Sequence, residues 1–171
     1  MAGLAAIALR SLAPGDTAWV AKEQWRHYRD VEGFDDRFKT VLGNALEDFE
    51  ASTGDELARA FIAVRGNERL GCVFCSAEGP NVARLRMFYV VPTVRGSRLG
   101  YRLLAALVEH ARQNARDVVR LWTYAQHEAA CRLYAHSGFE LRESRTAFDY
   151  GRHLTLQRWE KALTATDLPS D

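Results

Sequence analysis

The spacing of apolar residues along this chain divides it into two kinds of segment. Runs rich in β-branched and aromatic residues predict strands, and apolar residues recurring every three or four positions predict helices. The predicted strands are Ala5–Arg10, Ala60–Val64, Arg69–Ser76, Val82–Val91, Val118–Thr123, Phe139–Arg145 and His153–Trp159. The predicted helices run from Asp16 to about Asp30, onward from about Asp35, from about Leu99 to Ala111, and over Glu128–Ser137.

The predicted order is therefore β-α-α-β-β-β-α-β-α-β-β. This order is neither an uninterrupted alternation of strands and helices nor all-β. A mixed α/β fold, with one mixed sheet and helices packed on both faces, is the economical solution. Its 171 residues are enough to bury a sizeable core, so we expect residues 1–171 to form a single domain.

Composition narrows the class of protein. The net charge is +1, from 23 basic and 22 acidic residues, which gives no broad field for a nucleic-acid backbone. No stretch approaches the length of apolar sequence that spans a bilayer, and the N-terminal segment lacks the basic start of a signal peptide. Three cysteines cannot all pair within one chain, and Cys72 and Cys75 have no second pair with which to form a metal site. We therefore expect a cytoplasmic protein with reduced thiols, no metal, no nucleic-acid partner and no membrane span.

The segment Arg84–Leu104 carries the clearest chemical signal. It reads RLRMFYVVPTVRGSRLGYRLL, a strand followed by a turn with Gly96 and Gly100 and then a helix. The start of a helix presents unpaired N–H donors and a partial positive charge, which together suit a phosphate. Arg95 and Arg98 add charged donors. A basic helix start without any ligand is the alternative interpretation.

Two motifs then resemble one family. Phe88–Gly100, FYVVPTVRGSRLG, resembles the signature of the GNAT superfamily, in which a strand and a proline precede Gln/Arg-x-x-Gly-x-Gly/Ala and a helix. Ala130–Phe139, ACRLYAHSGF, resembles the second signature, Ala-x-x-x-Tyr-x-x-x-Gly-Phe. The chain is most similar to the acetyltransferase half of bacterial MarR–GNAT fusion proteins. The resemblance implies a GNAT-type, mostly antiparallel mixed sheet with helices on both faces, and acetyl-CoA as the cofactor.

The resemblance also implies positions for the cofactor. The pyrophosphate of acetyl-CoA would lie on the turn formed by Arg95, Gly96, Ser97, Arg98, Leu99 and Gly100. Arg98 stands where the family has its middle glycine, so its side chain would either crowd the phosphate or bind it. The pantetheine arm would pair with the main chain of Phe88, Tyr89 and Val90.

Tyr134 matches the tyrosine that related enzymes place near the CoA sulfur. A phenol with a pKa of about 10 can give a proton to a departing thiolate at neutral pH. Packing on a helix face is the alternative role for Tyr134. His127 stands at the start of the second motif, where it is a CoA contact, a substrate-side group or an exposed residue at the helix start.

The general base is the least defined element. An alkylammonium with a pKa of about 10 must lose a proton before its nitrogen can attack. Leu85–Val91 contains no carboxylate, whereas Glu32 and His27 lie in and before the loop between the first two helices. Glu32 is the candidate base that the MarR–GNAT resemblance favours, and a solvated surface carboxylate is the alternative. The aromatic residues expected to wall an acceptor pocket are Trp25, Tyr28, Phe34, Trp122 and Tyr150.

These observations predict transfer of an acetyl group from acetyl-CoA to a primary amine, by direct attack in a ternary complex. The acceptor is a small-molecule or peptide amine, and a homodimer is possible. The alternative is a non-catalytic acyl-CoA-binding sensor or interaction module with the same fold.

Overall fold

One seven-stranded sheet organises the computed structural model, which describes residues 6–52 and 54–163. The strand order is β1-β2-β3-β4-β5-β7-β6, and every neighbouring pair is antiparallel except the parallel pair β4–β5. The strands are β1 (Ala8–Arg10), β2 (Arg59–Arg65), β3 (Glu68–Ala77), β4 (Val82–Val90), β5 (Val118–Tyr124), β6 (Glu140–Asp149) and β7 (Arg152–Ala162).

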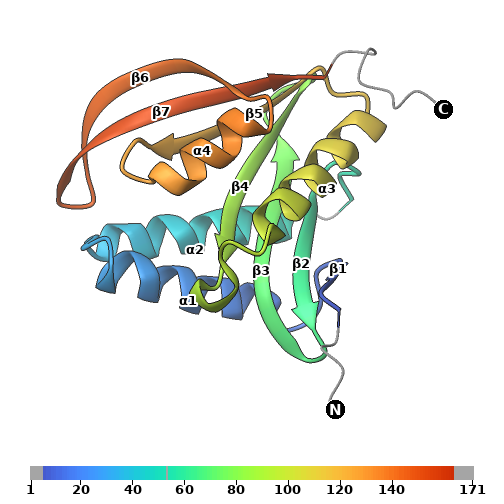
Figure 1. Cartoon of the computed structure of the whole chain (residues 1–171), viewed down its shortest axis with the longest axis horizontal. Coiled ribbons are helices and arrows are strands. Elements are labelled where there is room, and N and C mark those ends of the chain that lie inside the picture. Colours follow the sequence, from blue (N-terminus) through green and yellow to red (C-terminus); the bar gives the residue numbers. More distant parts are fainter. Residues whose placement is uncertain (1–5, 53, 164–171) are drawn as a thin grey trace.

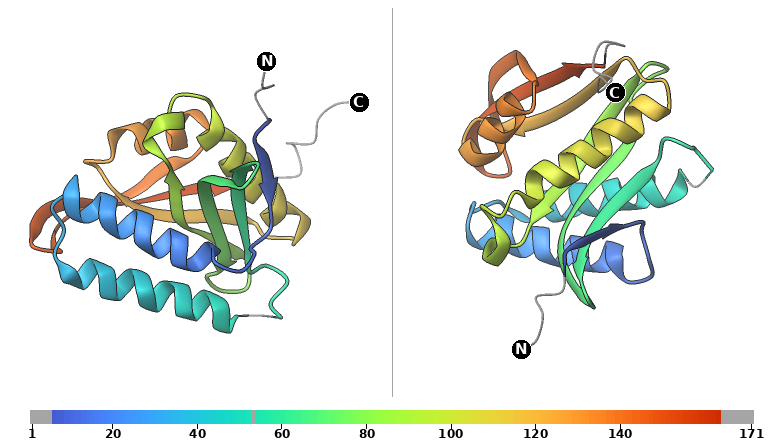
Figure 2. Two further views of the ribbon diagram at one scale, coloured as in Figure 1. Left: turned by 90° about the horizontal axis from the view of Figure 1, so that it is seen from below. Right: turned by 45° about the vertical axis from the view of Figure 1, so that its right-hand side comes forward.

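Helices cover both faces of this sheet (Figures 1 and 2). They are α1 (Asp16–Asp30), α2 (Asp36–Ala51), α3 (Leu99–Gln113) and α4 (Glu128–His136), with a 3₁₀ turn over Pro92–Val94. Two clusters of buried side chains result. One packs α3 and α4 against the sheet through residues such as Leu103, Leu107, Val119 and Tyr134. The other packs α1 and α2 against β2, β3 and β4 through residues such as Val20, Leu46, Ile62 and Phe74.

The predicted order of elements and the mixed α/β class are confirmed. Helix boundaries fall within a few residues of the prediction, whereas β6 and β7 extend well beyond the predicted strands. Most of β6 is exposed on both faces, so it lacks the apolar alternation from which a strand end is read. Of the predicted first strand, Ala5 lies outside the described residues, and the observed strand begins at Ala8.

Asp16, the first residue of α1, does not cap this helix. Gly15, at φ 87°, is the capping residue of α1, and no side-chain cap is formed there. The carboxylate of Asp16 is instead fully buried, and Arg10 lies 2.6 Å and Arg69 2.7 Å from its oxygens. It also accepts a hydrogen bond from the N–H of Ala13. This buried ion triad ties β1, α1 and β3 together.

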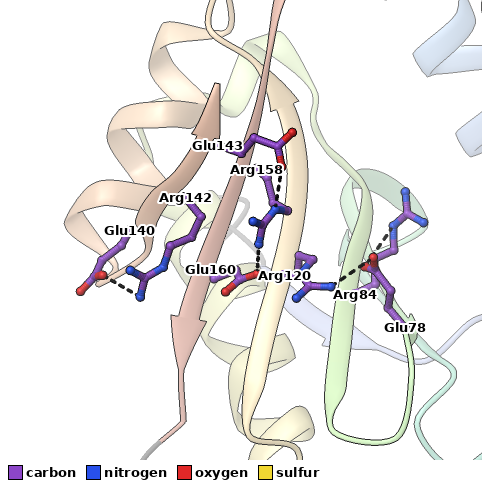
Figure 3. Close-up of polar contacts among 8 residues, drawn as sticks. All are labelled: Glu78, Arg84, Arg120, Glu140, Arg142, Glu143, Arg158 and Glu160. Atoms are coloured by element: carbon purple, nitrogen blue, oxygen red, sulfur yellow. Dashed lines mark hydrogen bonds and ion pairs between the residues drawn. The ribbon is translucent and has the colours of Figure 1, made fainter. Parts of the chain in front are cut away.

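The α1–α2 layer packs mainly against β2, β3 and β4. Charged side chains of the neighbouring strands form a row of ion pairs (Figure 3). Arg120 on β5 lies 2.7 Å from Glu160 on β7 and 3.4 Å from Glu78 before β4. Arg158 extends the row from β7 to Glu143 on β6, at 3.3 Å. Each exposed ion pair contributes less than about 1 kcal/mol, so the row mainly keeps this open half of the sheet polar.

Two further expectations concern membrane spans and the state of the cysteines. None of their helices is long and apolar enough to cross a membrane. Cys72, Cys75 and Cys131 are all free thiols, and burial raises the pKa of both Cys72 and Cys75 to about 12. The prediction of buried reduced thiols is therefore confirmed for Cys72 and Cys75, while Cys131 is partly exposed.

Candidate active site

The site begins where β4 separates from β5. The two strands pair only at Val82–Arg84 with Val118–Arg120. Farther along, Met87 has a positive φ of 50° and the register with β3 shifts, which marks a β-bulge. The end of β4 thus lacks a strand partner on its β5 side, and the Val90 carbonyl accepts a hydrogen bond from Arg95 Nε at 3.0 Å instead.

A cavity of about 640 Å³ opens at this separation. That volume lies within the range of small-molecule sites. Its walls come from the end of β4, the turn before α3, the start of α4, and the end of α1 with the following loop. Ten of the predicted site residues border it: Glu32, Phe88, Tyr89, Val90, Arg95, Gly96, Arg98, Gly100, His127 and Tyr134.

Two predicted residues, Ser97 and Leu99, do not border the cavity. The N–H of Ser97 donates to the Val94 carbonyl at 3.3 Å, so this donor is already used. The side chain of Leu99 is 1% exposed and packs in the core beneath α3. Any contact of Leu99 with a phosphate would therefore involve its main chain alone.

The turn before α3 has the features of an anion site. The first hydrogen bond within α3 runs from the N–H of Arg102 to the carbonyl of Arg98, at 3.1 Å. The N–H groups of Leu99, Gly100 and Tyr101 therefore have no acceptor within the helix, as at any helix start. Together with the helix dipole and the guanidinium groups of Arg95 and Arg98, they favour a negatively charged group.

Glycine is favoured at Gly100 because the turn is closely packed. A Cβ there would lie 3.3 Å from Cδ2 of Leu133 and 3.6 Å from Cζ of Phe88, on the cavity wall. At Gly96, with φ 80°, a Cβ would meet no atom within 4 Å, so conformation and not space favours glycine. The residues present fit a CoA pyrophosphate on the main chain of this turn.

Arg98 adopts the left-handed conformation that the glycine of the signature provides, at φ 66° and ψ 8°. A side chain pays a steric cost there, so Arg98→Gly is expected to raise the free energy of unfolding by about 1 kcal/mol. Chemical denaturation measures this change, and a less stable variant would contradict it. The CoA dissociation constant of the same variant shows whether the guanidinium binds the phosphate or crowds it.

The position of Tyr134 is compatible with both roles considered for it. Its side chain is 4% exposed and packs in the core, with ring centroids 6.2 Å from Phe88 and 5.8 Å from Phe139. It also borders the cavity beside the end of β4. Burial raises the pKa of its phenol well above the usual value, so the hydroxyl keeps its proton at neutral pH.

Glu32 lies between two histidines on the opposite wall. Its Oε1 is 3.6 Å from Nε2 of His27, on α1, and 3.6 Å from Nε2 of His127, which precedes α4. The three side chains are 17–25% exposed. Glu32 is thus not the solvated carboxylate of the alternative interpretation, and His127 is not an exposed helix-start residue.

The two imidazoles are neutral near pH 7. Burial lowers the pKa of His27, Arg95 lowers it further, and Glu32 opposes the shift. Burial also lowers the pKa of His127, again against the effect of Glu32. Both rings can therefore accept a proton, which a histidine that is already charged cannot do.

The predicted aromatic wall is only partly correct. Tyr28 borders the cavity, whereas the structure places Trp25, Phe34, Trp122 and Tyr150 outside its lining. Phe34 and Tyr150 stack on each other at 5.1 Å, and the guanidinium of Arg158 lies over Trp122 at 5.8 Å. These aromatic side chains pack against neighbouring groups outside the cavity.

Several cavity residues were not among the predicted site residues: Val31, Val94, Tyr101, Thr123, Gln126, Glu128, Ala129, Ala130 and Leu133. Most lie within a few residues of the two motifs, so the motifs locate the wall without identifying its side chains. Among the described residues, no group of histidine, cysteine and acidic side chains could hold a metal ion.

The comparisons with known proteins agree with this geometry. The sequence profile of the acetyltransferase (GNAT) family matches residues 18–139. The chain belongs to this family. An uncharacterized N-acetyltransferase of Methanocaldococcus jannaschii is 28% identical over 89 residues, which are 48% of this chain and 39% of that protein. The chain therefore matches less than half the length of this curated relative.

Two solved structures share the fold. One is yncA of Salmonella typhimurium, an inferred acetyltransferase solved with its cofactor acetyl-CoA, with a TM-score of 0.78 and 19% identity. The match covers 96% of this chain and 98% of yncA. The other is a ribosomal-protein-alanine N-acetyltransferase of Brucella melitensis, with a TM-score of 0.76 and 22% identity over 91% of this chain and 99% of that one.

Proposed function

We propose that this chain transfers an acetyl group from acetyl-CoA to a primary amine, by direct attack within a ternary complex. The observation that carries the proposal is one cavity that borders both the anion site before α3 and a carboxylate–histidine group, with Tyr134 in its wall. Family membership supports it, as does the acetyl-CoA bound in the yncA structure. The similarity to MarR–GNAT proteins stays a prediction, as do the single domain and the cytoplasmic location.

The turn before α3 would hold the pyrophosphate, and the unpaired end of β4 would align the pantetheine arm. When bound, acetyl-CoA supplies a thioester whose carbonyl carbon an amine can attack. Val90 is suited to this role because its carbonyl bonds to Arg95 and not to a neighbouring strand. Arg95 would have to release this carbonyl for pantetheine to pair with it.

Tyr134 and Glu32 would act on the two proton transfers of the reaction. The hydroxyl of Tyr134 would hold a proton for the departing thiolate. Glu32 would attract the acceptor as an ammonium and, with the histidines beside it, promote the removal of its proton. A carboxylate in a partly buried site attracts a cation more strongly than one in open water, because the local dielectric constant is lower.

The decisive experiment is a thiol-release assay with a panel of acceptors. The panel includes polyamines, arylalkylamines, free amino acids and peptides, one of them with an N-terminal alanine. We expect CoA release above the rate of hydrolysis with at least one class of amine. If calorimetry shows tight CoA binding and no amine gives release, the non-catalytic sensor is the correct function.

A further inference from the structure

We infer that the imidazole of His27 accepts the proton of the substrate, and that Glu32 and His127 orient this imidazole. These three side chains, here called the relay, come from three separate elements of the fold. This inference rests on the proposed function and deepens it. His27 is near the end of α1, Glu32 lies in the following loop, and His127 is the residue before α4. One carboxylate oxygen, Oε1 of Glu32, lies 3.6 Å from both imidazoles.

The loop that carries Glu32 is fixed in place by a distant part of the chain. Arg152, at the start of β7, donates to the Glu32 carbonyl at 2.9 Å, and the N–H of Asp35 donates to the Tyr150 carbonyl at 3.0 Å. Gly33, at φ 70°, leaves room for this contact, since a Cβ there would lie 2.7 Å from Nη1 of Arg152. The β6–β7 turn therefore sets the position of the Glu32 main chain.

The imidazoles are held as well. The ring of Tyr28 lies edge-on to both, with centroids 5.6 Å from His27 and 5.7 Å from His127. The aromatic cluster of Tyr28, Phe34 and Phe38 backs this ring, so Tyr28 is a fixed surface against which both imidazoles pack. The group is preorganised before any substrate binds, as a catalytic proton acceptor requires.

The contacts of the two histidines assign different roles to them. Nδ1 of His127 lies 3.5 Å from Oγ1 of Thr123, and its Nε2 faces Glu32, so both nitrogens have partners. Nε2 of His27 also faces Glu32, but no described residue forms a hydrogen bond with its Nδ1. If Nε2–H of His27 points to the carboxylate, Nδ1 keeps the lone pair that accepts a proton.

The step assigned to His27 is a simple proton transfer. An N–H bond of the acceptor ammonium breaks, its electron pair stays on nitrogen, and the proton goes to Nδ1 of His27. The resulting imidazolium is stabilised by Glu32. The ordinary pKa of an imidazole, near 6.5, is closer to the ammonium pKa of about 10 than the pKa of a carboxylate, about 4.3, so an imidazole is intrinsically the better proton acceptor. Burial and Arg95 lower the pKa of His27 and reduce this advantage, and Glu32 opposes that loss.

Nuclear magnetic resonance titration of the histidines tests the relay without turnover. Glu32 raises the pKa of both imidazoles, so Glu32→Gln should lower both values. His127 lowers the pKa of His27, so His127→Asn should raise it. The other groups that face His27 are Arg95, Tyr28 and Tyr89, and Tyr28 and Tyr124 face His127; these are left unchanged. His153, an exposed residue outside the cavity, is left unchanged as well.

Kinetics with an acceptor from the panel provide the second readout. His27→Asn should lower kcat about a hundredfold or more, the usual loss for a general base. His127→Asn should shift the acidic limb of the pH profile of kcat/KM to higher pH, and Glu32→Gln should shift it to lower pH. His153→Asn is the matched control, expected to keep the wild-type rate and profile.

The outcomes separate the inference from the proposed function. Unchanged pKa values of His27 and His127 in Glu32→Gln, or a wild-type rate and acidic limb in His27→Asn, would overturn the relay even in an active enzyme. A correctly coupled titration in a protein that acetylates no amine would overturn the proposed function, and with it any catalytic role of His27. Unchanged unfolding temperatures of the variants exclude misfolding as the cause.

Discussion

Replacing Tyr134 with phenylalanine is expected to lower kcat about a hundredfold and to leave the CoA dissociation constant within about twofold of wild type. The variant keeps the ring that packs between Phe88 and Phe139 and removes only the hydroxyl. Burial makes this phenol a weaker acid, and the same dry cavity makes a thiolate a stronger base. Proton transfer between them therefore remains feasible. Thiol-release kinetics and calorimetry measure the two quantities.

Tyr150→Phe is the matched control, since it also removes one hydroxyl from a half-buried tyrosine, but outside the cavity lining. It should keep the wild-type kcat. An unaltered kcat in Tyr134→Phe would remove Tyr134 from the mechanism and leave it a packing residue. A loss confined to CoA affinity would instead assign it to binding.

Replacing Asp16 with asparagine is expected to lower the free energy of unfolding by about 3 kcal/mol. The carboxylate is fully buried, and two guanidinium groups and one N–H depend on it. Loss of its charge leaves Arg10 and Arg69 uncompensated. Both arginines are about one-third exposed, so water can partly solvate them, which places the effect at the lower end of the range for buried ion pairs. Chemical denaturation measures the change.

Asp30→Asn supplies the control for Asp16→Asn. Asp30 ends the same helix, and its carboxylate is also paired with an arginine, Arg29, at 2.6 Å. Its side chain is half exposed, so water replaces the lost pair and the denaturation midpoint should not change. Equal effects of the two substitutions would show that burial of Asp16 does not strengthen its ion pairs.

The Asp16 carboxylate also predicts how stability changes in acid. Burial alone would raise its pKa, but hydrogen bonds from Arg10, Arg69 and Ala13 lower the pKa to about 2, from 3.8. Because the folded-state pKa is depressed, its contribution is fully present above about pH 4 and is lost as the pH falls toward 2. The stability difference between wild type and Asp16→Asn should therefore shrink across this interval. A constant difference would contradict the assigned pKa.

The cofactor side of the site was readable from the sequence because its determinants are local. A turn that needs glycine at Gly96 and Gly100, followed at once by a helix, defines an anion site within a few residues. Tyr134 belongs to a motif of similar length. In such segments, neighbouring residues fix the main-chain geometry, so spacing along the chain is nearly spacing in the molecule. The same holds for the order of helices and strands, whose periods are visible over short windows.

The acceptor side could not be read in this way, because its residues are distant in sequence. Local patterns in the sequence give no sign that His127 lies beside Glu32, nor that Arg152 fixes the loop between α1 and α2. These contacts exist only because β7 inserts between β5 and β6, which brings the β6–β7 turn and the start of α4 to the end of α1. The buried triad of Asp16 likewise depends on the pairing of β1 with β2 and of β2 with β3.

The sequence by itself determined the class of fold, the family and the turn on which a pyrophosphate would lie, since each is set by short-range periodicity or by a contiguous motif. Only the tertiary structure decided the surroundings of Glu32. A carboxylate in a loop is a solvated group or a proton relay according to which side chains the rest of the fold brings beside it, and here the fold brings two neutral imidazoles.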